Sequence, residues 1–116
     1  MRELNATQSI LASVLRKARE AEKRVRSLQL AIGEIAELDH SSIQNHWEEL
    51  SQGTLVERAQ LNFRSIKAEV QCMACFQKYY PVDGKIHCPY CGSFGAKILS
   101  GEEFFLESIE WDDDKT

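Results

Sequence analysis

The chain has 116 residues, 43% of them hydrophobic, which suits one ordinary domain or one small domain with a minor lobe. No apolar run approaches the ~20 residues that cross a bilayer, and the charged start lacks the apolar stretch of a secretory signal, so we expect a cytoplasmic protein with no membrane insertion. The net charge of −4 argues against a nucleic-acid partner, because affinity for nucleic acid comes mainly from neutralising phosphates.

The charge is unevenly distributed. Residues 1–26 carry a balance of +4, and the remaining residues carry −8. The basic side chains cluster at the end of this first segment: Arg16, Lys17, Arg19, Lys23, Arg24 and Arg26. The cluster either faces an acidic partner or is the solvated C-terminal end of a helix, where the helix dipole favours cations. The dipole argument favours the second interpretation.

The first half of the chain predicts a helix, a strand and a second helix. Residues 7–22 have apolar positions at helical spacing, with Thr7 as a possible N-cap. Residues 25–32 alternate as a strand with one buried face. Residues 39–51 have the helical pattern again, and Ser41 or Ser42 is a suitable N-cap.

The second half predicts strands around a cysteine segment. Residues 59–63 alternate as a strand, and residues 66–70 continue with the opposite phase, so we expect a bulge or break near residues 64–65. A final strand is expected within residues 102–111. The predicted fold class is α+β: a small sheet of about three strands with two helices, plus a zinc-ribbon-like lobe. The α+β domain would comprise residues 1–67 and 99–116, and the lobe residues 68–98.

All four cysteines lie in this lobe, as two Cys-x-x-Cys pairs separated by twelve residues: Cys72, Cys75, Cys88 and Cys91. A two-residue gap lets both thiolates of a tight turn bind one ion, and two such turns supply the four tetrahedral corners that zinc prefers. Iron bound by the same thiolates and a pair of redox disulfides are the rival interpretations. Four thiolates close the coordination shell, so the predicted zinc is structural.

Other metal-binding or catalytic patterns are weak. His87 adjoins Cys88, but four thiolates already fill the predicted site, and His40 and His46 fall on different helix faces. The lobe's aromatic residues could stack on nucleic-acid bases or form the lobe's own small core: Phe76, Tyr79, Tyr80, Tyr90 and Phe94. The sequence has no phosphate-binding glycine loop, HExxH motif or nucleophile elbow, so we do not expect an enzyme.

Several segments together resemble the HypA/HybF family of nickel metallochaperones for hydrogenase and, in some organisms, urease maturation. The resemblance runs from residue 1 to about residue 111. It is carried by Met1-Arg2-Glu3-Leu4, Gln8-Ser9-Ile10-Leu11, Leu28-Gln29-Leu30-Ala31-Ile32-Gly33-Glu34, the two cysteine motifs with Gly92-Ser93, and Ile98-Leu99-Ser100-Gly101-Glu102-Glu103.

The resemblance implies an α+β nickel domain with a four-cysteine zinc lobe. It also implies a partner GTPase nickel chaperone and delivery of nickel to the large subunit of a nickel–iron hydrogenase. In the family, nickel binds at the extreme N-terminus through the terminal amine, the imidazole of the second residue and nearby backbone nitrogens. Planar nitrogen donors of this kind suit divalent nickel.

Residue 2 of this chain departs from that pattern, because it is Arg instead of His. A guanidinium stays protonated and offers no lone pair to a metal. Candidate nickel-binding residues are therefore Met1, Arg2 and Glu3 through the terminal amine and backbone alone. Two hypotheses follow. The chain is a nickel carrier with weak or relocated nickel ligation, which His40, His46 or a partner would complete, or it has lost nickel and acts as an adaptor that contacts a hydrogenase subunit or accessory protein.

Overall fold

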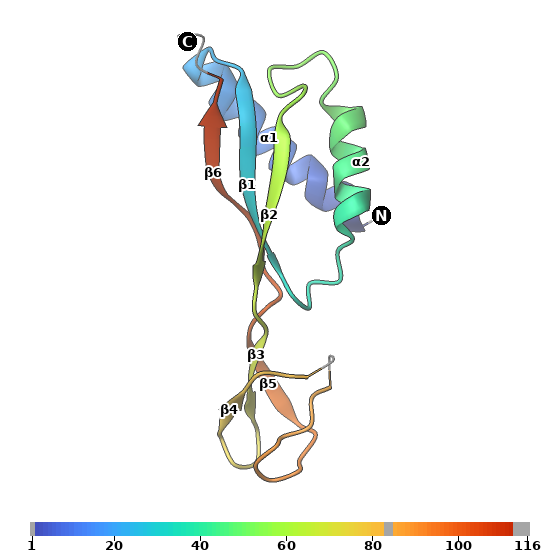
Figure 1. The fold of residues 1–116 in the computed structure, drawn as a ribbon, viewed down its shortest axis with the longest axis vertical. Helices are drawn as coiled ribbons and strands as arrows, with labels where there is room; N and C mark the ends of the chain where they lie inside the picture. The colour runs from blue at the N-terminus through green and yellow to red at the C-terminus, as the bar shows by residue number, and fades with distance from the viewer. Residues whose placement is uncertain (1, 83–84, 113–116) are drawn as a thin grey trace. The chain divides into compact units, whose positions relative to one another are not determined.

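A computed structural model describes residues 2–82 and 85–112 of the chain. It contains two α-helices and six β-strands (Figure 1). In chain order these are α1 Arg2–Ala21, β1 Val25–Gly33, α2 His40–Leu50, β2 Gln60–Ile66, β3 Glu69–Cys72, β4 Lys78–Tyr79, β5 Ala96–Ser100 and β6 Phe104–Trp111. The predicted fold class is confirmed: two helices accompany a three-stranded sheet, and a further small sheet carries the cysteine segment.

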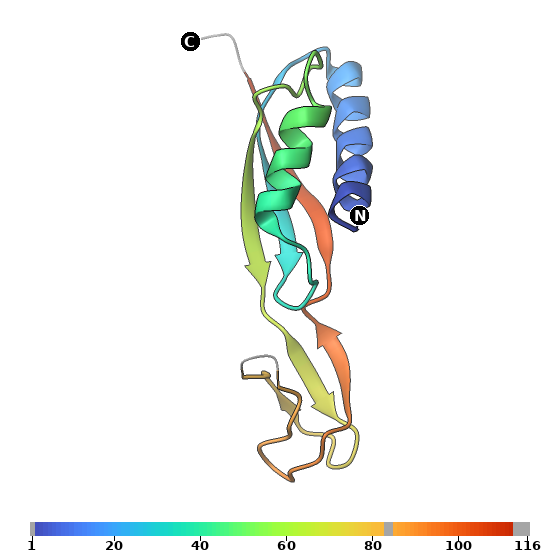
Figure 2. The ribbon, with the colours of Figure 1, turned by 90° about the vertical axis from the view of Figure 1, so that its right-hand side faces the viewer.

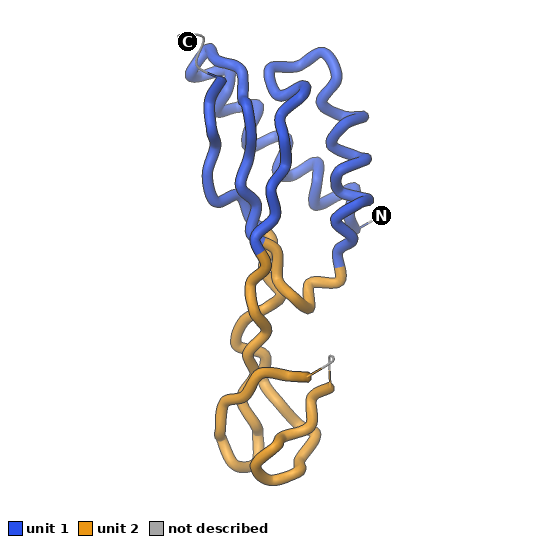
Figure 3. The backbone as a smooth tube through the Cα atoms, viewed as in Figure 1, with its two compact units in different colours: residues 1–31, 38–64, 105–116 blue, residues 32–37, 65–104 orange. Residues whose placement is uncertain are grey.

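The chain divides into two compact units (Figure 3). Unit 1 comprises residues 1–31, 38–64 and 105–116, and unit 2 comprises residues 32–37 and 65–104. Unit 1 holds both helices, whereas unit 2 holds the four cysteines.

The core of unit 1 lies between a sheet and two helices. The strands are ordered β2-β1-β6, and α1 and α2 lie on the same side of this sheet (Figure 2). The two helices and the central strand contribute side chains that are at most 9% exposed: Ile10, Val14 and Ala18 from α1, Ile43 and Trp47 from α2, and Leu28 and Leu30 from β1. Burial of each larger side chain among them contributes roughly 1.5–3 kcal/mol, so this layer is the main source of stability in unit 1.

The first helix begins at Arg2, so the prediction that Thr7 caps it is wrong. Thr7 is buried inside the helix, and its Oγ1 donates a hydrogen bond to the Glu3 carbonyl at 2.6 Å. The helix extends further back because the Glu3 carboxylate stabilises its first turn, where the helix dipole favours an acid. That carboxylate also accepts a hydrogen bond from the Asp39 amide, which ties the start of α1 to the start of α2.

The second helix is capped by Asp39, not by Ser41 or Ser42 as predicted. The Asp39 Oδ2 accepts hydrogen bonds from the Ser42 N–H at 3.0 Å and from the Ser42 hydroxyl at 2.9 Å. Asp39 has the extended backbone of an N-cap, whereas both serines lie in the first helical turn. The cap thus comes one residue before the helix begins.

The sheet of unit 2 is ordered β4-β3-β5, and β3 pairs antiparallel with both neighbours. Its small core consists of Val70, Cys72, Tyr79 and Cys88. The chain leaves the β2 pairing only after Ile66, so the break predicted near residues 64–65 falls at residues 67–68. The sequence pattern does not predict strand β5. The pairing of β5 with β3 shifts by one residue between Glu69, which faces Ser100, and Val70, which faces Ile98.

Two glycines in unit 2 allow a close backbone crossing. The Gly33 N–H donates to the Glu103 carbonyl at 2.6 Å, and a Cβ on Gly33 would overlap the carbonyl of Gly101. Gly101 itself has a φ of 109°, a conformation that L side chains rarely adopt. The turn at the end of β1 therefore requires a residue without a side chain at position 33.

Among the residues that the structure describes, neither helix is long and apolar enough to cross a membrane.

Candidate metal centre

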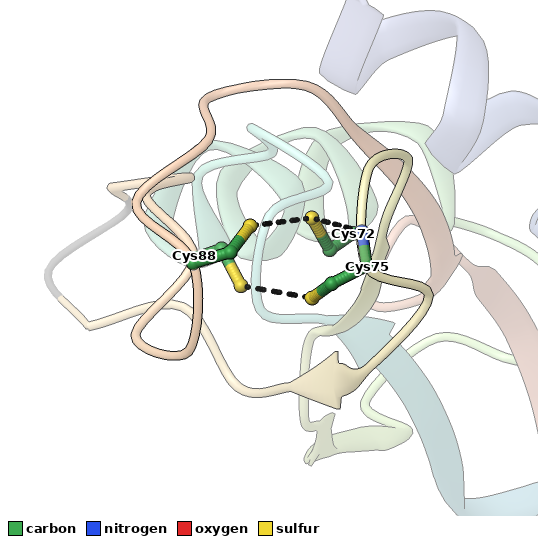
Figure 4. A group of neighbouring side chains, drawn as sticks. Cys72, Cys75 and Cys88 are labelled. Carbon is green, nitrogen blue, oxygen red and sulfur yellow. Dashed lines mark hydrogen bonds between the residues drawn. The ribbon is translucent and has the colours of Figure 1, made fainter.

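The four cysteines converge on one point in unit 2. Figure 4 labels three of them, Cys72, Cys75 and Cys88. Their Sγ atoms all lie within 4.8 Å of one another, and the Cys72–Cys91 and Cys75–Cys88 pairs are each 3.6 Å apart. Cys72 and Cys88 are buried, Cys75 is half-buried and Cys91 is exposed. One thiol of each Cys-x-x-Cys pair is therefore anchored in the small core, and the other lies nearer the surface.

The two cysteine turns have the same backbone geometry. In the first turn, the Phe76 N–H donates to the Cys72 carbonyl at 3.0 Å, and in the second the Gly92 N–H donates to the Cys88 carbonyl at 2.9 Å. Each turn ends at a residue in the left-handed region: Phe76 has a φ of 64° and Gly92 a φ of 82°. The sequence predicts the second turn better than the first, because only Gly92 adopts this conformation without strain.

Backbone amides also point at the sulfur atoms. The Cys72 Sγ accepts hydrogen bonds from the Ala74 and Cys75 amides at 3.3 and 3.4 Å, and the Cys88 Sγ accepts one from the Tyr90 amide at 3.4 Å. N–H donors aimed at sulfur stabilise the thiolate, which is the form that binds metal. Each turn thus prepares its first cysteine for coordination.

The donor set fits a tetrahedral ion. A Zn–S bond of about 2.3 Å implies sulfur atoms about 3.8 Å apart at the corners of a tetrahedron, close to the 3.6 Å found for both pairs. A disulfide needs sulfur atoms about 2.05 Å apart, so the pairs as they stand are not disulfide-bonded. Four thiolates suit zinc or iron, and neither leaves an open position for a substrate.

The protonation of the thiols shows why the cluster needs a cation. The Cys75 N–H, aided by the Ala74 N–H, lowers the pKa of the Cys72 thiol to about 6 against the effect of burial. The Ser93 amide acts to lower the pKa of Cys91, but the hydrogen bond with Cys72, burial and the other thiols together raise that pKa to about 12. Ionisation of one thiol opposes ionisation of the next, unless a positive ion compensates the charge.

Of the lobe's aromatic residues, only Tyr79 lies in the small core. Four others are between 52% and 77% exposed: Phe76, Tyr80, Tyr90 and Phe94. The ring of His87 stacks on Phe94, with centroids 4.9 Å apart. His87 thus makes a surface contact beside the second cysteine turn and is not part of the four-thiol group.

At the N-terminus, the structure describes Arg2 and Glu3, whereas Met1 lies outside the described residues. The Glu3 carboxylate is engaged by the Asp39 amide at 3.0 Å, and this bond, followed by one from its own backbone N–H, lowers the pKa of Glu3. The imidazole of His40 stacks on Phe63 with centroids 4.5 Å apart. Among the described residues, the cysteines are the one group of three or more His, Cys, Asp or Glu side chains arranged for a metal.

The comparisons with known proteins cover nearly the whole chain. The family model described as "Hydrogenase/urease nickel incorporation, metallochaperone, hypA" matches residues 1–111. The hydrogenase maturation factor HypA of Dehalococcoides mccartyi is 36% identical over 115 residues, which cover 98% of this chain and 97% of that protein. The HypA of Aquifex aeolicus is 30% identical and covers 95% of this chain and 96% of its own length.

The fold agrees with a solved structure of the same family. The solution structure of the nickel metallochaperone HypA from Helicobacter pylori matches with a TM-score of 0.67 and 25% sequence identity. The match covers 94% of this chain and 96% of that one. From the sequence and the fold together, the chain belongs to the HypA family of metallochaperones for hydrogenase and urease nickel incorporation.

Proposed function

We propose that this chain carries nickel to the large subunit of a nickel–iron hydrogenase during maturation of that enzyme. The observation that carries the proposal is the family match over residues 1–111, which includes the N-terminal segment as well as the cysteine lobe. A carrier needs a site that both binds and releases its metal. An N-terminal site on exposed backbone meets this need better than a closed four-thiolate site does.

The proposed nickel ligands are the terminal amine of Met1 and the backbone nitrogens of Arg2 and Glu3. Because α1 begins at Arg2, these amides belong to its first turn, where N–H groups have no carbonyl partner within the helix. Nickel binding to the Glu3 nitrogen would break no bond to a helix carbonyl, although it would replace the hydrogen bond from that N–H to the Glu3 carboxylate. The positive end of the helix dipole and the Arg2 guanidinium oppose a divalent cation, so we expect weaker binding than with a histidine at residue 2.

The proposed role of the second metal is structural. Zinc held by Cys72, Cys75, Cys88 and Cys91 would close the two turns of the lobe at residues 68–98 into a unit separate from the nickel domain of residues 1–67 and 99–116. The core of this lobe consists of four residues, two of them cysteines, which is too small to fold without the metal. The zinc ion would take no direct part in nickel transfer.

The proposed partners follow from the maturation role. A GTPase nickel chaperone would supply or release nickel, and the hydrogenase large subunit would receive it in the cytoplasm. The family description also names urease, so nickel transfer to a metal-free urease is worth measuring beside transfer to the hydrogenase.

The second candidate function is that of an adaptor without nickel. Two observations favour it: residue 2 is Arg, and the neighbouring Glu3 carboxylate is already bound by the Asp39 amide. In this case the chain would contact a hydrogenase subunit or accessory protein through its sheet edge and cysteine lobe, and the metal would come from elsewhere.

A nickel titration separates the two functions. The full chain with its native N-terminus is titrated with Ni²⁺ by calorimetry, alongside Arg2→His and a chain whose Met1 amine is acetylated. The carrier predicts one nickel per chain, tighter binding by Arg2→His and loss of binding in the acetylated chain, because the amide nitrogen it creates has no free lone pair to donate to nickel. If only Arg2→His binds, the carrier proposal is wrong, and capture of a metal-free large subunit would then support the adaptor.

A further inference from the structure

Strand β5 forms one edge of the sheet in unit 2 (Figure 2, orange). It pairs with one side of β3, and β4 pairs with the other side. An edge strand presents unpaired N–H and C=O groups, which are a template for a further strand, and natural proteins usually protect such edges with proline or charges. Strand β5 has the sequence Ala-Lys-Ile-Leu-Ser, with no proline and a single charge. Its open edge is therefore weakly protected.

The backbone groups of Ala96 and Ile98 face this open edge. On β3, the Cys72 N–H donates to the carbonyl just before β4 at 2.9 Å, so the Cys72 backbone is directed away from β5. The direction of backbone hydrogen bonds alternates along a strand. Cys72 pairs with Ala96 and Val70 pairs with Ile98, so β5 bonds to β3 through Lys97, which lies between them. The amides of residues 96 and 98 are left for another strand.

A hollow of about 230 Å³ lies at the end of β5, and this hollow is here called the β5 hollow. Its lining consists of five residues: Ile98, Leu99, Ser100, Glu102 and Glu103. Neighbouring residues of a regular strand point to opposite faces, but the shift in pairing between Ile98 and Ser100 is a bulge, which re-aims a side chain. The bulge explains why Ile98 and Leu99 line the same hollow. The β5 hollow thus starts at a residue whose backbone faces the open edge.

The β5 hollow has an apolar wall and an acidic rim. The wall is formed by Ile98 and Leu99, which are 36% and 37% exposed. Hydrogen bonds from its own N–H and from the Gly101 amide lower the pKa of Glu103, so this rim carboxylate is ionised at neutral pH. Within the described part of the chain, the Glu102 carboxylate makes no hydrogen bond or ion pair.

The negative charge of the rim is not balanced by cations in the lining. Among the described residues that line the β5 hollow there is no lysine or arginine. Lys97 lies beside the hollow in the sequence but does not line it, and the Lys67 ammonium lies over the Tyr80 ring at 4.1 Å. The β5 hollow therefore has two acids and an apolar wall, which is complementary to a basic side chain with an aliphatic stem.

We propose that β5 pairs with an extended segment of a partner protein, and that the β5 hollow holds an arginine of that segment. Hydrogen bonds to the backbone of Ala96 and Ile98 would supply affinity, and the hollow would supply the preference for arginine. The arginine stem would lie on Ile98 and Leu99, and its guanidinium would bind the carboxylates of Glu102 and Glu103 in the bidentate manner that arginine favours.

A second copy of the chain fits this edge less well than a basic segment does. Pairing of β5 with β5 would bring two acidic hollows side by side, and like charges would repel. The proposal is independent of nickel transfer, because every residue that carries it lies in unit 2 and none is a proposed metal ligand.

The test uses the full, ¹⁵N-labelled chain as purified and the peptide Thr-Val-Arg-Val-Thr with both ends blocked, at millimolar concentration. Hydrogen-exchange protection should rise at the Ala96 and Ile98 amides and stay unchanged at Lys97, whose N–H is already directed at β3. Glu102→Gln should weaken binding about fivefold, the effect of losing one exposed ion pair. The spectrum of this variant should match that of the parent outside the β5 hollow, because the carboxylate has no partner within the described chain.

Matched controls separate strand pairing from general charge. Glu49→Gln removes the same charge from the exposed surface of α2 and should change the affinity less than twofold. A peptide with norleucine in place of arginine should bind more weakly and be insensitive to Glu102→Gln, and a fully N-methylated peptide should not bind.

Four results would overturn the proposal. They are the absence of added protection at Ala96 and Ile98, equal losses in Glu49→Gln and Glu102→Gln, undiminished binding of the N-methylated peptide, and protection of the two amides that rises with protein concentration alone. The last result would show that β5 pairs with a second copy of the chain.

Discussion

The Glu3 carboxylate accepts a hydrogen bond from the Asp39 amide at 3.0 Å, and Asp39 in turn caps α2. Through these two residues, the first turn of α1 and the first turn of α2 are joined by one short chain of hydrogen bonds. Glu3 is one of the proposed nickel ligands, and this bond holds it in place although it lies close to a chain end, where fraying is common.

This relationship predicts a pH-dependent contribution to stability. Its bond to the Asp39 amide lowers the pKa of Glu3 in the folded state. The stabilisation is therefore present above the unfolded value of about 4.3 and is lost as the pH falls through the lower folded pKa. The melting temperature of Glu3→Gln should lie below that of the parent chain at pH 7 and converge with it in acid.

The control for this effect is Glu49→Gln, which removes an exposed carboxylate from the surface of α2. Its melting temperature should follow the parent chain across the same pH range. A Glu3 titration midpoint at or above about 4.3, measured by carbon-detected NMR, would contradict the hydrogen bond.

The four-thiol group predicts one tightly bound zinc per chain. Metal analysis of freshly purified protein should find zinc at a ratio close to one. Removal of the zinc by a chelator should be accompanied by uptake of protons by the freed thiolates, to an extent that depends on pH. Well under one zinc per chain, or iron in its place, would refute the zinc assignment.

The metal should also hold the lobe together. Cys72→Ser removes a thiolate that is buried in the core of the lobe, so amide protection should be lost across residues 68–98 and retained in α1 and β1. Met73→Ala is the matched control, because Met73 lies in the same turn with its side chain 61% exposed. An unchanged hydrogen-exchange pattern in Cys72→Ser would show that the metal does not support the fold.

Because Gly33 and Gly101 cross closely, one methyl group added at residue 33 should strongly lower the stability of the fold. Gly33→Ala places a Cβ onto the Gly101 carbonyl, so the backbone has to shift, at about 2 kcal/mol or more of unfolding free energy. Gly95→Ala should cost little, since its Cβ would meet only the Met73 side chain at 3.8 Å. Denaturant unfolding of both variants checks the difference, and equal stability would rule out the close crossing.

Local patterns in the sequence predicted the features whose causes are local. The periodicity of residues 25–32 identified β1, and the cysteine spacing identified a four-sulfur group, because both ligands of each pair belong to one turn. The start of α1 was missed since it depends on the bond between Glu3 and Asp39, which lie 36 residues apart. A threonine before an apolar stripe was a stronger local signal than that distant contact.

Other features depend on contacts that sequence patterns do not reveal. Strand β5 exists because Ile98 pairs with Val70 across the cysteine segment, and its exposed side chains have no simple alternation. One hollow of unit 1 brings Arg58 beside Arg24, which precedes it by more than thirty residues. The sequence does not distinguish core from surface among the aromatic residues of the lobe, whereas the structure buries Tyr79 and exposes the other four.

The proposed delivery of nickel is tested most directly by a transfer measurement. The chain with its native N-terminus is loaded with ⁶³Ni, freed of excess metal and mixed with the metal-free large subunit of a hydrogenase from the same organism. The account predicts that ⁶³Ni moves to the large subunit faster than from a small-molecule nickel complex at the same free nickel concentration, and that acetylation of the Met1 amine abolishes the advantage. Equal rates from the loaded chain and the free complex would contradict it.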